Sequence, residues 1–390
     1  MEECLEDSYQ YKCLVYYYFG WVDYTIFATM LTVAASVGIF LSWRSRTTTV
    51  DDFALGGRQM HAIPTSLSMM STSISAITVL GTPAEFYSFG GMYIWMAVVN
   101  PIALVIAAEI FIPLFYRLKV KTTYEYLEMR FSRPVRQLTM ILFFIVALIY
   151  TGLAIYAPSI ALSAVTGMDI NLAILSTGCV CIFYTVLGGM KGVILTDAFM
   201  SIWMIAGLFA VTIKASQDIG YETIWAKARE SGRAEFFTSS WDMTVRNSLQ
   251  AILVGNIIGG NTGAFCTNQA YVQRLISCKS INHARAAAYL AIPSIIAVMT
   301  LCLTSGFAMA AYYEQCDPFA AKLLERGDQL MPYLTTWVFE AMPGVAAIYV
   351  SGAFAGALST VSSFIRFNLL AYVNTNTIIR VVQFGSLNMC

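Results

Sequence analysis

The feature that most constrains this chain is a series of long apolar runs. About nine of them are close to 20 residues long, which is the length that an α-helix needs to cross a bilayer. They cover roughly residues 20–43, 62–82, 90–116, 137–157, 160–188, 192–214, 247–273, 286–311 and 343–365. Only 12% of the 390 residues are charged, whereas about 25% is typical of a soluble domain. The chain is therefore predicted to be an all-α protein that crosses a membrane many times.

Positive charges predict the orientation of these helices. Basic residues follow the first, third and seventh runs, and they are Arg44, Arg46, Arg58, Arg117, Lys119, Lys121, Arg130, Arg133, Arg136, Arg274, Lys279 and Arg285. Since Lys and Arg are enriched in cytoplasmic loops, these segments are expected in the cytoplasm and the N-terminus outside. The loops near Pro83 and Pro158, and those at 215–246 and 312–342, are then expected on the outer side. The acidic N-terminus does not resemble a cleavable signal peptide.

Net charge and cysteine content limit which other classes of function the chain can have. The net charge is zero, so nothing indicates a nucleic-acid partner. The nine cysteines have no zinc spacing and are predicted to pack as small apolar side chains. Cys4, Cys13 and Cys316 fall on the predicted outer side, where a disulfide is the alternative. An enzyme is disfavoured, because His61 and His283 lie at predicted membrane edges and no acid–base cluster is indicated.

Two of the runs contain residues that interrupt a helix. The stretch from Ser66 to Thr82 is crowded with Ser and Thr, whose side chains compete for backbone hydrogen bonds. The run 247–273 carries glycine and asparagine from Gly255 to Gly263, which weaken a continuous helix. Broken helices at matching places in two halves favour a transporter built as an inverted repeat. Close packing of small residues is the alternative. The predicted repeats are about 62–214 and a partial one at about 247–364, in a single domain 1–364.

The last run, from Pro343 to Ile365, carries small residues on adjacent helix stripes. A spacing of four places each set on one face. The sets are Ser351, Ala355 and Ser359, and Gly352, Gly356 and Thr360. Such stripes are typical of close helix packing. The alternative is that the Ser359 and Thr360 hydroxyls point at an ion.

Several ordered motifs resemble one known family. They are D-D-F-A-L-G-G-R (51–58), L-G-T-P-A-E-F-Y (80–87), T-Y-E-Y-L-E-M-R-F (123–131), Y-T-V-L-G-G-M-K-G-V-I-L-T-D (184–197), N-Q-A-Y-V-Q-R (268–274) and S-G-A-F-A-G-A-L-S-T-V-S-S (351–363). Over about residues 20–364 the chain resembles the sodium/solute symporters, and its L-G-T-P-A-E-F-Y run is similar to the iodide, monocarboxylate and multivitamin branch. The resemblance implies the inverted-repeat symporter fold, a plasma-membrane location, sodium as the coupling ion, and no other cofactor.

The resemblance also implies a sodium site between the second and ninth helices. Carried over by position, its ligands are the carbonyls of Ser71 and Ile74, a carbonyl near Gly356, and the hydroxyls of Ser359 and Thr360. This ligand set is chemically reasonable, because sodium is a hard cation that prefers several oxygen ligands. Asp197 falls in the family's T-D motif. It either assists sodium release or caps a helix at the membrane interface.

Departures from the family narrow the substrate class. The sugar carriers stack an aromatic ring where this chain has Ala264, and they place a glutamate after the double glycine Gly90-Gly91, where this chain leads to Ile94 and Trp95. A pocket for many hydroxyls needs such polar partners. The predicted partner is therefore a small anionic solute, an organic monocarboxylate or a vitamin. Candidate pocket residues are Thr78, Trp95, Phe265 and Asn268, with packing as the alternative for each.

Two further acids have open roles. Glu109 lies in an apolar segment, where an acid is a functional candidate or pairs with a basic residue at the cytoplasmic end. Glu85 belongs to either a gate or a solvated loop.

The similarity ends near residue 364. Family members continue with further helices, whereas this chain has a divergent tail at 365–390. The second repeat is expected to be incomplete. The alternative function is a truncated, non-transporting isoform that associates with full-length carriers or is degraded.

Overall fold

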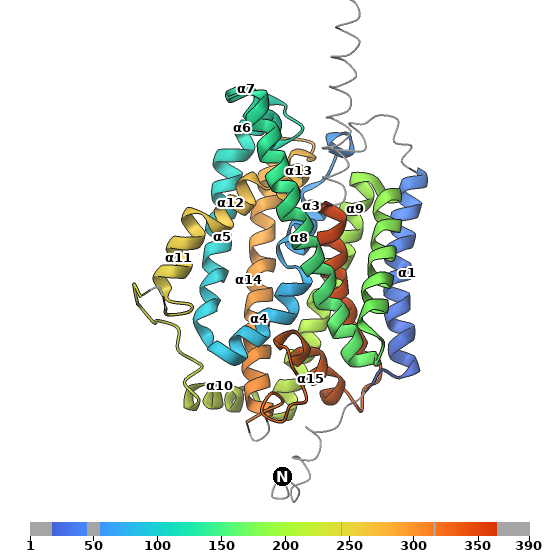
Figure 1. The fold of residues 1–390 in the computed structure, drawn as a ribbon, viewed down its shortest axis with the longest axis vertical. Coiled ribbons are helices and arrows are strands. Elements are labelled where there is room, and N and C mark those ends of the chain that lie inside the picture. Colours follow the sequence, from blue (N-terminus) through green and yellow to red (C-terminus); the bar gives the residue numbers. More distant parts are fainter. Residues whose placement is uncertain (1–17, 45–54, 243, 315–316, 365–390) are drawn as a thin grey trace, which may run out of the picture.

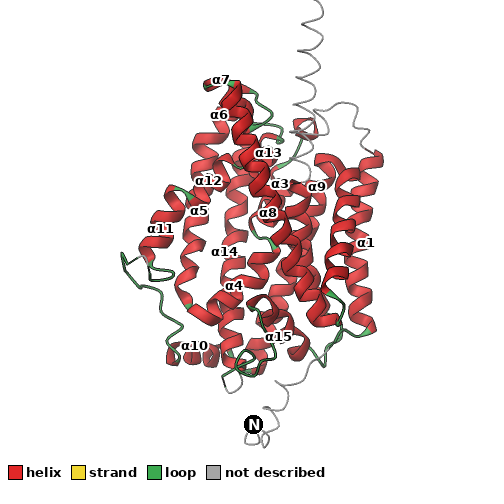
Figure 2. Cartoon of the chain, in the orientation of Figure 1, coloured by secondary structure: helices red, strands yellow, loops and turns green. Residues whose placement is uncertain are grey.

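The computed structural model describes residues 18–44, 55–242, 244–314 and 317–364. Within these ranges the chain consists of helices joined by loops and contains no strand (Figure 2). The all-α fold class is confirmed. The predicted tail 365–390 and the disulfide candidates Cys4, Cys13 and Cys316 lie outside the described residues.

Most of the predicted spans are long apolar helices. Five helices of the described residues are long and apolar enough to cross a membrane: Gly91–Leu118, Arg133–Thr166 (α8), Gly192–Asp218 within α9 (Ile170–Asp218), Ile281–Tyr312 (α14) and Val345–Phe364, here named the terminal span. The pair α3 (Ala62–Ser73) and α4 (Ala76–Phe89), bent by 56°, makes a sixth. The other three predicted runs are helical as well, in α1 (Trp21–Arg44), the first part of α9, and α11 (Leu249–Ile258) with α12 (Gly260–Thr267).

Shorter elements complete the bundle. Gly91–Leu118 is built from η3 (Gly91–Trp95), α5 (Met96–Ile106), the π-helical turn η4 (Ala107–Phe111) and α6 (Ile112–Leu118). The connecting elements are η2 (Gly56–Arg58), α7 (Thr123–Arg130), α10 (Tyr221–Glu230), α13 (Gln269–Ile276), η5 (Gly327–Gln329) and α15 (Leu330–Val338). α7 lies at one end of the bundle, and α10 and α15 lie at the opposite end (Figure 1). These ends are named the α7 end and the α10 end.

Two predicted helix ends are wrong, both beside a proline. Helix α8 continues through Pro158 to Thr166 and ends at Gly167, whose φ is +70°. Helix α4 continues through Pro83 to Phe89 and ends at Gly90, whose φ is +81°. A proline removes one backbone donor, and a membrane helix tolerates this loss where neighbouring groups satisfy the freed carbonyl. The chain therefore turns at the glycines, which adopt the left-handed conformation at little cost.

Both predicted helix breaks are confirmed. Between α3 and α4, Ile74 (φ −107°, ψ 87°) and Ser75 (φ −79°, ψ 174°) leave the helical conformation. Between α11 and α12 the break is at Gly259 (φ −129°, ψ −54°). The Ser/Thr-rich and Gly/Asn-rich segments thus interrupt their spans at the expected places. The boundaries of the two repeats remain predictions.

The broken helix lies at the centre of the bundle, and the terminal span packs beside it (Figure 1). In the terminal span, 89% of the residues in its apolar 18-residue stretch are buried, whereas the corresponding share in α8 is 11%. Directly before the terminal span, the Gly344 amide donates a hydrogen bond to the buried carboxylate of Asp23 in α1 (2.9 Å). A negative charge at this place complements the helix N-terminus. The terminal span is therefore held in the interior, with α3 and α4 against it.

Candidate cation site

The break between α3 and α4 frees backbone oxygen atoms in the bundle interior. In a continuous helix the Ser75 amide would donate to the Ser71 carbonyl and the Thr78 amide to the Ile74 carbonyl. Here the Thr78 amide donates to Ser75 instead, and no described amide donates to Ser71 or Ile74. The chain at both residues is fully buried. These two carbonyls are free of backbone donors in the described part of the chain, and their role as sodium ligands stays a prediction.

The terminal span touches the break at Gly356. A Cβ atom at this glycine would lie 2.9 Å from the Ala76 amide nitrogen and 3.3 Å from the Ile74 carbonyl oxygen. Only a residue without a side chain permits so close an approach. The predicted ligands Ile74 and Gly356 therefore lie side by side, although they are far apart in the sequence.

The two predicted hydroxyl ligands, Ser359 and Thr360, are buried, and so is the hydroxyl of Ser71, which was predicted as a ligand only through its carbonyl. The Oγ atoms of Ser71 and Ser359 make no hydrogen bond in the described structure, and both residues are 0% exposed. Thr360 Oγ1 donates to the Gly356 carbonyl (2.9 Å) and keeps its own lone pairs. A buried hydroxyl without a partner costs about 1–3 kcal/mol. Neutral hydroxyl and carbonyl oxygens are the type of ligand that a small monovalent cation prefers.

A buried ion pair lies next to these oxygens. Asp197 of α9 is 0% exposed, and its Oδ2 accepts hydrogen bonds from Arg274 Nη2 of α13 (2.7 Å) and from Ser68 Oγ (2.8 Å). Arg274 also donates to Ser68 Oγ, Ser363 Oγ and the Ala270 carbonyl, each at 2.7 Å. The interpretation of Asp197 as an interfacial helix cap is wrong, because α9 is continuous through this residue and the carboxylate is paired inside the protein. Its role in sodium release stays a prediction.

The ion pair and the predicted ligands are connected through Ser359. The side chain of Ser359 faces the Asp197 carboxylate, yet neither Ser359 Oγ nor Asp197 Oδ1 makes a hydrogen bond of good geometry. One carboxylate oxygen of Asp197 is thus bound by Arg274 and Ser68, and the other remains free beside the neutral oxygens. This arrangement adds partial negative charge next to the candidate cation site.

Sequence reasoning missed Arg274, Ser68 and Ser363 as members of this network. Arg274 was interpreted only as an orientation signal. The available indication was its position in the buried helix α13, between Gln273 and Leu275, which are also buried. Buried charges are paired in stable proteins, so an arginine in a buried helix requires an acidic partner, and Asp197 is one.

A tyrosine hydroxyl supports the α3 side of the break. Tyr271 OH of α13 donates to the Thr72 carbonyl (3.1 Å), which would bind the Ala76 amide in a continuous helix. The Tyr271 ring packs on Phe265, with centroids 4.8 Å apart. Phe265, one of the predicted pocket residues, is thereby placed near the break, and its contact with substrate stays a prediction.

The other predicted pocket residues are not gathered in one place. Thr78 lies in the first turn of α4. Asn268 caps α13 through a hydrogen bond from the Ala270 amide (2.9 Å) and lines a cavity of about 570 Å³ between α6, α7, α8 and α12. Trp95 lies toward the α10 end, where its indole donates to the Phe236 carbonyl (2.7 Å). All four residues remain predictions as substrate ligands.

The two acids with open roles are both paired. Glu109 binds Arg285 (2.9 Å) and accepts a hydrogen bond from Tyr289 OH (2.7 Å), so the predicted pairing with a basic residue is confirmed. Glu85 binds Arg246 (2.8 Å) and Asn247 (2.6 Å) toward the α10 end. The hydrogen bond to Glu85 raises the pKa of the Arg246 guanidinium. Neither acid is free to bind a cation without breaking its pair.

Comparison with known proteins shows which family the chain is similar to. The model of the sodium:solute symporter family matches residues 53–368. Sodium-coupled monocarboxylate transporter 1 of Mus musculus is 41% identical over 360 residues, which is 92% of this chain and 58% of the relative. The sodium/iodide cotransporter of Homo sapiens is 35% identical over 364 residues, which is 93% of this chain and 56% of the relative.

A solved structure has the same architecture. It is the substrate-bound, outward-open state of a Na⁺-coupled sialic acid symporter, with a TM-score of 0.80 at 25% identity. The similarity covers 91% of this chain and 75% of that structure. This chain thus spans a little over half of the length of the curated relatives described above.

Proposed function

The chain belongs to the sodium:solute symporter family, and from this premise we propose that it binds sodium and couples sodium entry to the uptake of a small anion. The observation that carries the proposal is the buried Ser359 hydroxyl without a hydrogen-bond partner among the described residues, together with the free carbonyls of Ser71 and Ile74. Leaving such groups unpaired is costly, and a bound sodium ion would satisfy them together. The proposed ligands are the Ser71 and Ile74 carbonyls, a carbonyl near Gly356, and the Ser359 and Thr360 hydroxyls.

The proposed substrate is an organic monocarboxylate or a vitamin. Its support is the identity to a sodium-coupled monocarboxylate transporter and the absence of the sugar carriers' aromatic and acidic residues at Ala264 and after Gly90-Gly91. The candidate contacts are Thr78, Trp95, Phe265 and Asn268. Of these, Phe265 has the best support, because its ring lies on Tyr271, which binds the broken helix.

The proposed cycle is alternating access across the plasma membrane. The basic residues of the α7 end favour a cytoplasmic location for that end, which puts the α10 end and the N-terminus outside. Sodium would enter from the α10 end, bind at the break and hold α3, α4 and the terminal span together. Each sodium ion that moves inward contributes about 2.3 kcal/mol per 100 mV of membrane potential. Asp197, with one free oxygen next to Ser359, would receive the ion on its way to the cytoplasm.

Uptake in cells tests the proposal. Cells that express the chain are expected to take up a radiolabelled monocarboxylate, such as lactate or nicotinate, in sodium buffer and not in choline buffer. Ser359→Ala and Thr360→Ala should each lower the apparent sodium affinity about tenfold or more, since a loss of 1.4 kcal/mol is tenfold. Thr300→Ala is the matched control, because its exposed hydroxyl bonds only the Ile296 carbonyl within its own helix. Sodium-dependent uptake that both site variants leave unchanged would contradict the assignment.

The non-transporting alternative gives a different result in the same experiment. A chain that does not transport by itself would show no uptake at normal surface levels, while the purified protein would still be stabilised by sodium. Uptake that is equal in sodium and choline would contradict both functions.

A further inference from the structure

Pro83 leaves one carbonyl of α4 without its helical donor. In α4 the residue that would donate to the Val79 carbonyl is Pro83, which has no backbone N–H. The hydroxyl of Tyr349 in the terminal span takes this place and donates to the Val79 carbonyl at 2.8 Å. A side chain from another span thus completes the hydrogen bonding of the broken helix.

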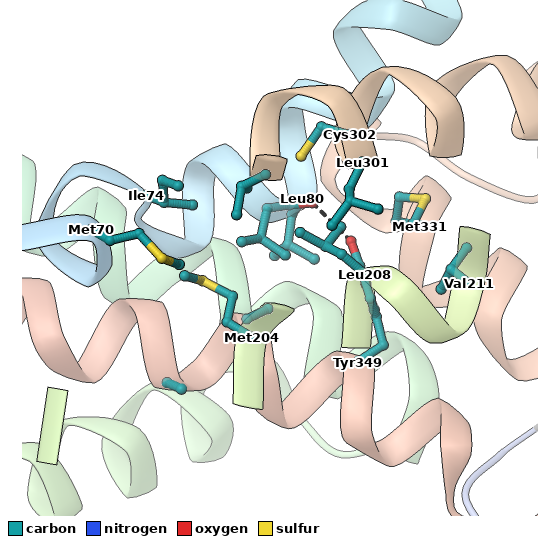
Figure 3. Close-up of a cluster of buried hydrophobic side chains, with 14 of the residues drawn as sticks. Met70, Ile74, Leu80, Met204, Leu208, Val211, Leu301, Cys302, Met331 and Tyr349 are labelled. Atoms are coloured by element: carbon teal, nitrogen blue, oxygen red, sulfur yellow. Dashed lines mark hydrogen bonds between the residues drawn. The ribbon is translucent and has the colours of Figure 1, made fainter. Parts of the chain in front are cut away.

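The bond lies in a tightly packed, dry part of the core. Tyr349 and Val79 are each 1% exposed, and the Tyr349 ring extends from the terminal span toward Leu80 and Leu301 (Figure 3). Gly207 of α9 permits the approach of the terminal span, since a Cβ there would lie 2.8 Å from the Tyr349 Cα. Without the hydroxyl, the Val79 carbonyl would be a buried acceptor with no partner, at a cost of about 1–3 kcal/mol.

The same two elements that this bond joins also form the candidate cation site. Tyr349 precedes Gly356 by seven residues, which is about two turns and the same face of the helix. Val79 follows the break at Ser75 by about one turn. Gly356 touches Ala76 and Ile74. The terminal span and α4 are therefore in contact at two places: Gly356 lies against the break at the site, and Tyr349 bonds Val79 next to it.

We propose that Tyr349 is a positioning residue for the cation site: its hydroxyl replaces the amide that Pro83 lacks and holds α4 against the terminal span, so that the oxygens at the break are in place to bind sodium. This inference rests on the proposed sodium function. Loss of the hydroxyl lowers the fraction of molecules whose site is ready to bind, and the apparent affinity falls by that fraction.

A double-mutant cycle with Pro83 tests this role. The purified chain is unfolded by heat over a range of NaCl concentrations, with choline chloride keeping the ionic strength constant. The sodium dependence of the midpoint gives an apparent Kd. Tyr349→Phe is expected to raise this Kd about three- to tenfold, which corresponds to about 0.7–1.4 kcal/mol. In a Pro83→Ala background the new amide supplies the missing donor, so adding Tyr349→Phe should change the Kd less than about twofold.

Two controls separate positioning from general packing. Tyr24→Phe removes a hydroxyl from an exposed ring of α1 that bonds none of the described residues, and it should leave the Kd unchanged. Tyr271→Phe removes the donor to Thr72, a carbonyl freed by the break and not by the proline. Its effect should therefore persist in the Pro83→Ala background.

The outcomes distinguish this role from the sodium site itself. A wild-type sodium response that Tyr349→Phe leaves intact would overturn the positioning role alone. A raised Kd that Pro83→Ala does not rescue would also overturn it, because the missing amide would not be the cause. A wild-type chain without any sodium response would overturn the proposed site, and the positioning role with it. If Tyr349→Phe alone does not fold, folding and a normal Kd in the Pro83→Ala background would support the role, and failure to fold there would overturn it.

Discussion

Replacing Arg274 by methionine is expected to destabilise the folded chain by about 3–5 kcal/mol, because the buried carboxylate of Asp197 would lose its counter-charge. Arg274 is 3% exposed and Asp197 is 0% exposed, so water cannot replace the lost partner. Three further acceptors, Ser68, Ser363 and the Ala270 carbonyl, would lose their donor as well. The thermal unfolding midpoint of the purified chain and its level at the cell surface measure the effect.

Two further variants show whether the loss comes from the unpaired charge. Asp197→Asn combined with Arg274→Met removes both charges and should recover part of the stability lost in Arg274→Met. Lys227→Met breaks the exposed pair with Glu314, and its cost should stay within about 1 kcal/mol. Equal losses of stability in Arg274→Met and Lys227→Met would show that the buried ion pair contributes no more to stability than an exposed one.

Replacing Gly356 by alanine should strongly weaken sodium binding, and this is the second large effect. The new Cβ would lie 2.9 Å from the Ala76 nitrogen and 3.0 Å from the Ser75 carbonyl carbon. Both are backbone atoms of the break, so the terminal span or α4 must shift. Overpacking of this kind costs about 1–3 kcal/mol, and a shift of the oxygens should lower the sodium affinity about tenfold or more.

Gly152→Ala is the matched control for this substitution. Gly152 lies in α8 with nothing within 4 Å of the added atom, and alanine favours a helix over glycine by about 0.5–1 kcal/mol. The control should therefore keep its sodium response and its stability. A Gly356→Ala protein with normal sodium affinity would show that the site does not depend on this contact.

The broken helices could be predicted because their cause is local. Ser and Thr between Ser66 and Thr82, and Gly and Asn between Gly255 and Gly263, compete with or weaken the helical hydrogen bonds within a few residues. The structure places the breaks at Ile74–Ser75 and at Gly259. The five predicted sodium ligands came from the motifs that resemble the family and stay predictions, although Gly356 does lie against Ile74 and Ala76.

The helix ends near proline could not be predicted from the sequence. Pro83 and Pro158 both lie inside helices, because a proline ends a membrane helix only when nothing satisfies the freed carbonyl. For Pro83 the replacement donor is Tyr349, more than 260 residues away in the sequence. A rule based on neighbours cannot include such a partner.

Contacts between side chains far apart in the sequence explain the other features that could not be predicted. The Asp197–Arg274 pair joins residues 77 positions apart, and nothing in either segment shows which distant charge is its partner. The substrate pocket was predicted from motif positions, and the structure places Trp95 near the Phe236 loop and Asn268 at the start of α13. Only the packed bundle decides which of these side chains face a common space.

The most direct test of the account is equilibrium binding of radioactive sodium to the purified chain, since it requires neither transport nor an identified substrate. The wild-type chain is expected to bind sodium saturably. Ser359→Ala and Thr360→Ala should lower the affinity about tenfold or more, and Thr300→Ala should bind as the wild type does. Saturable binding that both site variants leave unchanged, or no sodium binding by the folded wild-type chain, would contradict the assignment of the broken helix and the terminal span as a sodium site.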